Sequence, residues 1–145
     1  MKVRALTSVD AGAISAWRYP DRYSTYDVRD RSVLDRDHWA VTDAGWLIGY
    51  CCFGAPARVP GATEEDGTLD VGYGLRPDLI GRGAGHDFVA AILEFAAGQF
   101  APQRFRVHIL DWNGRSRRVA EGHDFSIDSV LQSTEGRFVV MVRRA

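Results

Sequence analysis

The stretch Thr68-Leu-Asp-Val-Gly-Tyr-Gly-Leu75, followed closely by Ile80-Gly-Arg-Gly-Ala-Gly85, decides the fold of this chain. In its first half apolar residues alternate with Asp70, Gly72 and Gly74, which predicts a strand with one nearly bare face. Two glycines on one strand face are typical of a close approach by another backbone or by a ligand. The glycine-rich second half leads into residues 86–100, where apolar residues recur at helical spacing.

A strand, a glycine-rich turn and a helix that begins in the turn form an anion site, because free backbone N–H groups and the positive helix terminus point outward together. A flexible strand-to-helix loop is the plain alternative. A nucleoside-triphosphatase loop is excluded, because it needs lysine after its last glycine and His86 follows Gly85. A dinucleotide fingerprint is excluded too, because counting from Gly81 puts His86 where its last glycine belongs.

Size and composition indicate an ordinary globular domain. The chain has 145 residues, of which 46% are hydrophobic and 26% charged, so we expect one domain over residues 1–145. Its formal net charge of −1 gives no global attraction to nucleic acid or to an anionic membrane. No stretch approaches the ~20 apolar residues of a membrane span, and the start lacks the apolar segment of a signal peptide. We therefore expect a cytoplasmic protein that binds neither partner.

The remaining patterns complete the predicted order of elements. Cys51 and Cys52 are adjacent in an apolar strand, where neighbouring side chains face opposite ways, so we expect free, buried thiols. The loop 54–67, with its prolines, glycines and acidic trio, should be exposed. Strands are predicted near 3–6, 38–42, 46–53, 105–109, 125–131 and 138–142, and helices near 11–17, 31–37 and 114–121. The turn Thr42-Asp43-Ala44-Gly45 predicts a hairpin of the second and third of these strands. Capping side chains lie in residues 7–10 before the first helix, and the last helix should begin after Asn113.

The glycine-rich turn resembles the acetyl-coenzyme A turn of the GNAT N-acetyltransferase superfamily. That signature reads Gln or Arg, two residues, Gly, one residue, then Gly or Ala, and here Gly83 and Gly85 match its small residues. Ile80 departs from its first place. The run-in Leu75-Arg-Pro-Asp78 also matches the family.

A second block of the same family matches farther along the chain. Asn113 stands at its first place, and Ser116, Val119 and Phe125 fit later places, whereas Ala120 replaces the usual tyrosine and Asp124 the usual glycine. The resemblance covers nearly the whole chain. It implies the α/β (α+β) class with a GNAT fold: a central, mixed, mostly antiparallel, twisted sheet of about six to seven strands flanked by about four helices.

The resemblance implies acetyl-CoA as the cosubstrate. Its pantetheine arm would pair with the backbone at Tyr73, Gly74 and Leu75, which would explain the bare strand face, and Asn113 matches the residue that contacts the pantetheine. The pyrophosphate would lie on main-chain amides, with the Arg82 side chain adding charge. The residues implied for that cradle are Gly81, Arg82, Gly83, Ala84, Gly85 and His86.

The implied reaction moves an acetyl group directly from the thioester to a primary amine of a small molecule or of a protein N-terminus. A base must deprotonate the ammonium, whose pKa is near ~10. Asp70 matches an acidic position of the ribosomal-protein acetyltransferase branch, and an exposed strand-start residue is the alternative. His108 is the second candidate, with a hydrogen-bonded strand histidine as the alternative. Because Ala120 cannot donate a proton, the thiolate leaves with a proton from water, with one from a hydroxyl such as that of Tyr73, or unassisted.

Other features leave more than one interpretation open. Trp17, Tyr19, Tyr23 and Tyr26 fall where the family builds its acceptor pocket, although aromatic core packing would look the same. No close ligand spacing joins the histidines, so we expect no metal. A monomer and a homodimer are both compatible with the sequence.

Two other functions compete with the enzyme. The main rival is a noncatalytic acyl-CoA-binding or regulatory module, which Ile80 and Ala120 favour because a side-chain contact and the usual acid are missing. An interaction domain without a cofactor would leave the glycine-rich strand face unexplained. Binding of acetyl-CoA separates the first two possibilities from the third.

Overall fold

The computed structural model describes all residues of the chain, 1–145. It contains seven strands, three α-helices and four short 3₁₀ helices. The sheet order is β1-β2-β3-β4-β5-β7-β6, in which β4 and β5 are parallel while β1–β2, β5–β7 and β6–β7 are antiparallel. The predicted fold class, a mixed and mostly antiparallel sheet flanked by helices, is confirmed.

The chain forms two compact units, each built from two segments. The first comprises Met1–Cys51 and Tyr73–Ile92, and the second comprises Cys52–Gly72 and Leu93–Ala145. The units interleave along the sequence, so the middle strand β4 (Thr68–Leu75) and the helix α2 (Gly85–Phe100) contribute residues to both. One domain over residues 1–145 stays a prediction.

In the first unit, β1 (Lys2–Ala5) leads into α1 (Ser8–Ala16) through a capping box. The Thr7 hydroxyl accepts from the Asp10 amide at 3.2 Å, and the Asp10 carboxylate accepts from the Thr7 amide at 2.8 Å. Arg4 donates to the same carboxylate at 2.6 Å, and these bonds lower the pKa of Asp10 to about 2. Capping side chains were predicted in residues 7–10 with the helix from residue 11, and the helix begins three residues earlier because Thr7 is its N-cap.

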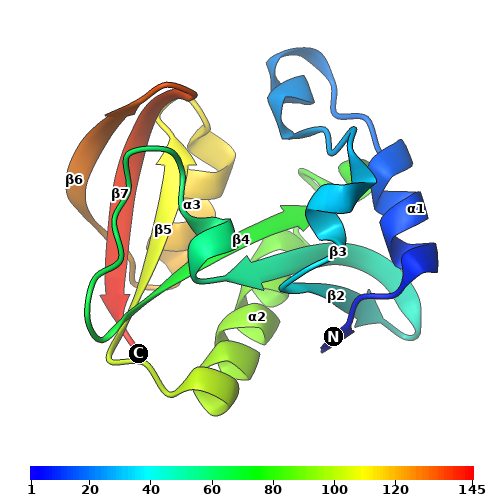
Figure 1. Cartoon of the computed structure of the whole chain (residues 1–145), viewed down its shortest axis with the longest axis horizontal. Coiled ribbons are helices and arrows are strands. Elements are labelled where there is room, and N and C mark those ends of the chain that lie inside the picture. Colours follow the sequence, from blue (N-terminus) through cyan, green and yellow to red (C-terminus); the bar gives the residue numbers. More distant parts are fainter. The chain divides into compact units, whose positions relative to one another are not determined.

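The rest of the first unit packs around a small apolar core. The strands β2 (His38–Asp43) and β3 (Trp46–Phe53) form the hairpin predicted from its turn, in which Ala44 and Gly45 have positive φ angles of 49° and 83° (Figure 1). The polar segment before β2 folds into the 3₁₀ helices η1 (Asp21–Tyr26) and η2 (Arg31–Leu34). Ala11, Ile14 and Leu34 form the buried core of this part.

In the second unit, β5 (Arg104–Leu110), β7 (Gly136–Arg144) and β6 (Ser126–Ser133) run side by side, as Figure 1 shows in yellow, red and orange. β4 pairs in parallel with β5 over Thr68–Asp70, and this register sets Asp70 beside Arg106. The helix α3 (Gly114–Gly122) follows β5, and a short 3₁₀ helix, η3 (Ala55–Ala57), lies in the largely exposed loop 54–67. None of the helices has the length and apolar character needed to cross a membrane.

Candidate functional site

The glycine-rich turn lies in the first unit, between η4 (Pro77–Leu79) and α2. Gly81 and Gly83 have φ angles of 75° and 83°, a left-handed conformation that disfavours residues with a Cβ. A Cβ added to Gly83 would meet no atom within 4 Å. The glycine is therefore required by the backbone conformation and not by protein packing.

The turn presents main-chain groups at the head of a helix. The Phe88 amide donates to the Ala84 carbonyl at 3.0 Å and so begins the helical ladder of α2, whose first turn contains Gly85 and His86. Gly81, Arg82, Gly83 and His86 are exposed. Backbone amides, a helix N-terminus and an exposed arginine thus meet in a segment suited to an anionic group.

The end of β4, where Tyr73, Gly74 and Leu75 lie, belongs to the same unit. The Leu75 carbonyl accepts a hydrogen bond of 2.6 Å from the Tyr19 hydroxyl, and burial raises the pKa of that hydroxyl. The Tyr73 ring packs edge-on against Phe88 with their centroids 6.0 Å apart. The chain segment before η1 is therefore tied to the carboxyl end of β4.

The face of β4 that carries Gly72 and Gly74 is not bare in the structure. We expected its glycines to leave room for a ligand, but side chains of β3 and the following loop cover them. A Cβ on Gly74 would lie 2.5 Å from the Tyr50 ring, and one on Gly72 would lie 2.9 Å from Cys52 Sγ. The glycines of β4 accommodate protein side chains, so the bare face is not evidence for the pantetheine arm.

The two candidate bases lie together in the second unit. Asp70 is fully buried, so the alternative of an exposed strand-start residue is wrong. Its Oδ1 accepts from Arg106 Nε at 2.6 Å, and its Oδ2 accepts from Arg106 Nη2 at 3.0 Å and from Arg58 Nη1 at 3.1 Å. Two guanidinium groups therefore already neutralise the charge of this carboxylate.

His108 lies beside this cluster, two residues after Arg106 on the same strand face. Its side chain is 2% exposed, and Nδ1 lies 3.9 Å from Asp70 Oδ1 without a hydrogen-bond partner. Burial and the neighbouring Arg106 and Arg58 lower the pKa of His108, while Asp70 opposes them. The imidazole is therefore neutral near pH 7 and able to accept a proton.

Asn113, also in the second unit, is the N-cap of α3. Its Oδ1 accepts from the Ser116 amide at 3.2 Å, and the residue is 8% exposed. This helix was predicted to begin after Asn113, and it does. Ala120, at the place of the family's tyrosine, is buried in the last turns of α3 and offers no hydroxyl.

The predicted residues thus fall into two groups. Tyr73 to His86 lie in the first unit, while Asp70, His108 and Asn113 lie in the second. The sequence did not identify Arg58 and Arg106 as partners of Asp70. The alternation that places Arg106 and His108 on one face of β5 was visible, but the register with β4 was not.

Aromatic side chains of the first unit lie in contact with one another. Tyr26 is 6.4 Å from both Tyr19 and Tyr23 between ring centroids, and Trp17 is 6.3 Å from Tyr50. Tyr19 is buried, whereas the other four are partly exposed. Both interpretations of these rings, aromatic packing and acceptor recognition, are compatible with this burial.

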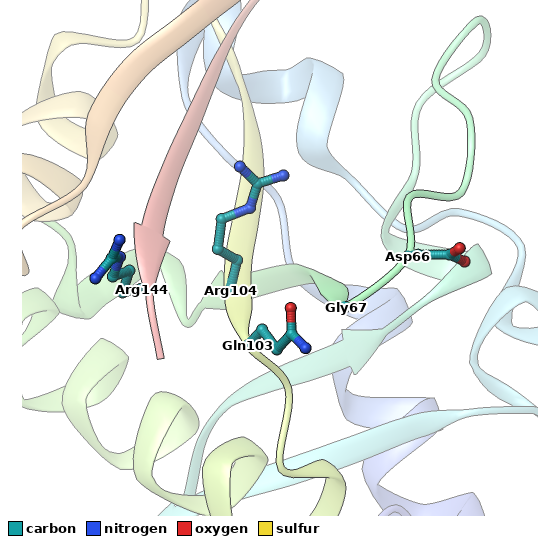
Figure 2. Close-up of a pocket in the computed structure, with 5 residues that line it drawn as sticks. All are labelled: Asp66, Gly67, Gln103, Arg104 and Arg144. Carbon is teal, nitrogen blue, oxygen red and sulfur yellow. The ribbon is translucent and has the colours of Figure 1, made fainter.

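A separate, open pocket of about 480 Å³ lies in the second unit where β4 and β5 begin (Figure 2). None of the predicted site residues lines it, and Arg104, which does, is already bonded to Glu65 at 2.9 Å. No group of three or more His, Cys, Asp or Glu side chains is arranged to hold a metal ion. The lining residues are Asp66, Gly67, Gln103, Arg104 and Arg144.

Solved structures share this fold across nearly the whole chain. The aminoglycoside acetyltransferase AAC(6')-Ib in complex with coenzyme A superposes with a TM-score of 0.76 at 20% identity, covering 99% of this chain and 94% of that one. A chimera of the spermidine N-acetyltransferase SpeG from Vibrio cholerae and hSSAT gives 0.76 at 14% identity, covering 99% and 94%. RimJ of Mycobacterium smegmatis in complex with CoA-disulfide gives 0.68 at 14% identity, covering 99% and 81%.

At these identities the likeness shows the fold alone, and no curated protein sequence matches the chain. A family model supplies the stronger finding, because the acetyltransferase (GNAT) domain matches residues 2–126. That span includes the glycine-rich turn, both candidate bases and Asn113. The fold, the turn at the head of α2 and this match over most of the sequence together make the chain a member of the GNAT acetyltransferase family.

Proposed function

We propose that this chain is an N-acetyltransferase that moves an acetyl group from acetyl-CoA directly to a primary amine of a small molecule or of a protein N-terminus. The observation that carries the proposal is the turn at the head of α2, where Gly81 and Gly83 adopt positive φ angles in an exposed backbone. Membership in the GNAT family supports acyl transfer as its chemistry. The AAC(6')-Ib structures with coenzyme A and the spermidine N-acetyltransferase chimera, which share the fold, support a small amine as acceptor.

Acetyl-CoA binds through main-chain groups in this proposal. The pyrophosphate accepts from the amides of the turn from Gly81 to His86, where the Arg82 amide exchanges its 3.4 Å bond to the Leu79 carbonyl for the ligand, and the Arg82 side chain adds a charge-assisted contact. The pantetheine arm runs along the end of β4 at Tyr73, Gly74 and Leu75. Asn113 contributes a contact to the pantetheine while it also caps α3.

His108 is the base in this proposal, in preference to Asp70. A base must be neutral or anionic and have a free lone pair, and burial keeps the imidazole neutral near pH 7. Both Asp70 oxygens already accept hydrogen bonds from guanidinium groups, so this carboxylate is engaged in a cluster with Arg58 and Arg106. The amine attacks the thioester carbonyl after it loses its proton. The thiolate then departs with a proton from water, with one from a hydroxyl such as that of Tyr73, or unassisted.

The partly exposed aromatic side chains before β2 are the proposed wall of the acceptor site. Trp17, Tyr23 and Tyr26 offer flat apolar faces on which the methylene groups of an amine pack, and such faces also attract cations. The Tyr19 hydroxyl, which donates to Leu75, ties this segment to the strand that receives the pantetheine.

Thermal unfolding with and without acetyl-CoA tests the binding step. A ligand that binds only the folded protein stabilises it by about 2.7 kcal/mol at a hundredfold excess over Kd. We expect a concentration-dependent rise in Tm with acetyl-CoA, and a smaller rise with adenosine, which lacks the pyrophosphate and pantetheine. The absence of any rise with acetyl-CoA would refute both the enzyme and the noncatalytic coenzyme-binding module.

A further inference from the structure

A cluster of charged side chains from three elements surrounds His108 in the second unit. Asp70 comes from β4, Arg106 from β5 and Arg58 from the loop before β4. On β7, the cross-strand neighbour of His108 is the apolar Val140. The charged groups that act on the imidazole are Asp70, Arg106 and Arg58, and all three are largely buried.

This inference rests on the proposed role of His108 as the base. We propose that Asp70, Arg58 and Arg106 are positioning residues that select which imidazole nitrogen carries the proton and keep the ring neutral before it accepts a second one. None of the three needs to touch acetyl-CoA or the amine. They act on the reaction only through His108.

The position of the carboxylate determines the tautomer. His108 Nδ1 is buried, lies 3.9 Å from Asp70 Oδ1 and has no other partner. A lone pair on Nδ1 would face the negative oxygen, whereas an N–H there would be attracted to it. The neutral ring therefore carries its proton on Nδ1, and Nε2 presents the lone pair that a base needs.

Burial keeps the ring neutral, and the two arginines contribute to this. The two guanidinium groups of Arg58 and Arg106 contact the Asp70 carboxylate, and Arg106 also contacts Glu65. Burial is the largest cause that lowers the pKa of His108, and Arg106 and Arg58 add to it, while Asp70 raises the pKa. The ring is thus held neutral at rest, and Asp70 still stabilises the imidazolium that forms during the reaction.

The loop 54–67 is joined to this cluster. Arg58 belongs to the loop, and Arg106 also donates to the Thr63 carbonyl at 2.6 Å and to Glu65 at 3.4 Å. The conformation of the loop therefore determines where the Arg58 guanidinium lies relative to His108. A merely structural role, in which the cluster only fastens the loop to the sheet, would leave the titration of His108 unaffected.

Arg58→Gln is the informative variant. Arg58 is 19% exposed, and Asp70 keeps both of its bonds to Arg106 when Arg58 is removed, so the variant is expected to fold. Arg104→Gln is the matched control, because Arg104 is a strand arginine that pairs with Glu65 but not with Asp70. The His108 ring proton is followed by NMR against pH, and it is assigned by its absence in His108→Gln. The rate kcat/KM is measured over the same pH range.

In Arg58→Gln the pKa of His108 rises, and the acid limb of kcat/KM moves to higher pH with it. In Arg104→Gln neither moves. Asp70→Asn, if it folds, moves the limb the opposite way and lowers kcat/KM about 10- to 100-fold, the size of loss that follows removal of a partner that orients a metal-bound histidine. An unchanged His108 titration in Arg58→Gln would overturn the inference alone. Full activity in His108→Gln would overturn the proposed base, and the inference with it.

Discussion

Gly83→Ala separates two roles of the glycine-rich turn: its backbone conformation in the folded protein and its proposed binding of the coenzyme pyrophosphate. A Cβ at this position meets no protein atom within 4 Å, so alanine destabilises the folded protein only through the positive φ of 83°. A left-handed conformation costs an L-residue about 1–2 kcal/mol. Alanine also lowers the conformational entropy of the unfolded chain, which offsets about 0.4–1 kcal/mol of that cost. The expected net loss of stability is therefore about 1 kcal/mol, which lowers Tm by about 3 °C in a chain of this size.

The effect on coenzyme binding should exceed the effect on folding. The added methyl group projects from the backbone that the pyrophosphate must approach, so we expect the Kd of acetyl-CoA to rise at least tenfold, or about 1.4 kcal/mol. Isothermal titration calorimetry well below Tm measures this on folded protein.

Gly98→Ala is the control for this experiment. Gly98 lies in the exposed part of α2, where a Cβ also meets nothing within 4 Å and φ is not positive. Alanine there should stabilise the protein by about 1 kcal/mol and leave Kd unchanged. An unchanged Kd in Gly83→Ala, with the control behaving as expected, would refute the pyrophosphate site at this turn.

Two further predictions concern the scaffold. Gly74→Ala places a Cβ 2.5 Å from the Tyr50 ring, which must then shift, so we expect a loss of about 1–3 kcal/mol in urea unfolding; wild-type stability would contradict the packing of this ring over Gly74. The Arg4–Asp10 pair stabilises the fold fully above the unfolded Asp pKa of 3.8 and loses that contribution as pH falls through about 2. With solvent screening of the half-exposed Arg4, the contribution is about 1–2 kcal/mol, so Asp10→Asn should lower stability at pH 6 but hardly at pH 2, and equal losses at both would contradict it.

Elements with a strong local signal were predictable from the sequence. Capping side chains in residues 7–10 predicted the start of α1 to within three residues, the alternation of residues 68–75 predicted β4, and Asn113 predicted the start of α3. In each case the deciding interaction lies within a few residues along the chain, so local pattern carries it.

The environment of the candidate bases was not predictable in this way. The burial of Asp70 depends on the parallel register that sets it beside Arg106, 36 residues away, and on Arg58 from a loop without periodic pattern. The prediction of a bare face on β4 was wrong for the same reason. A glycine that packs against the Tyr50 ring and one that contacts a ligand look alike in sequence. Alternation gives the face of a residue but not what covers that face.

Acetyl transfer itself is the most direct test of the proposed function. The full chain is incubated with acetyl-CoA and a panel of polyamines, aminoglycosides and peptides with free N-termini, and released thiol and acetylated product are both quantified, the latter by mass spectrometry. We expect thiol release that depends on at least one amine, with one acetylated amine for each thiol and with the activity lost in His108→Gln. Tight binding of acetyl-CoA without product from any amine in the panel would contradict the enzyme and favour the noncatalytic coenzyme-binding module.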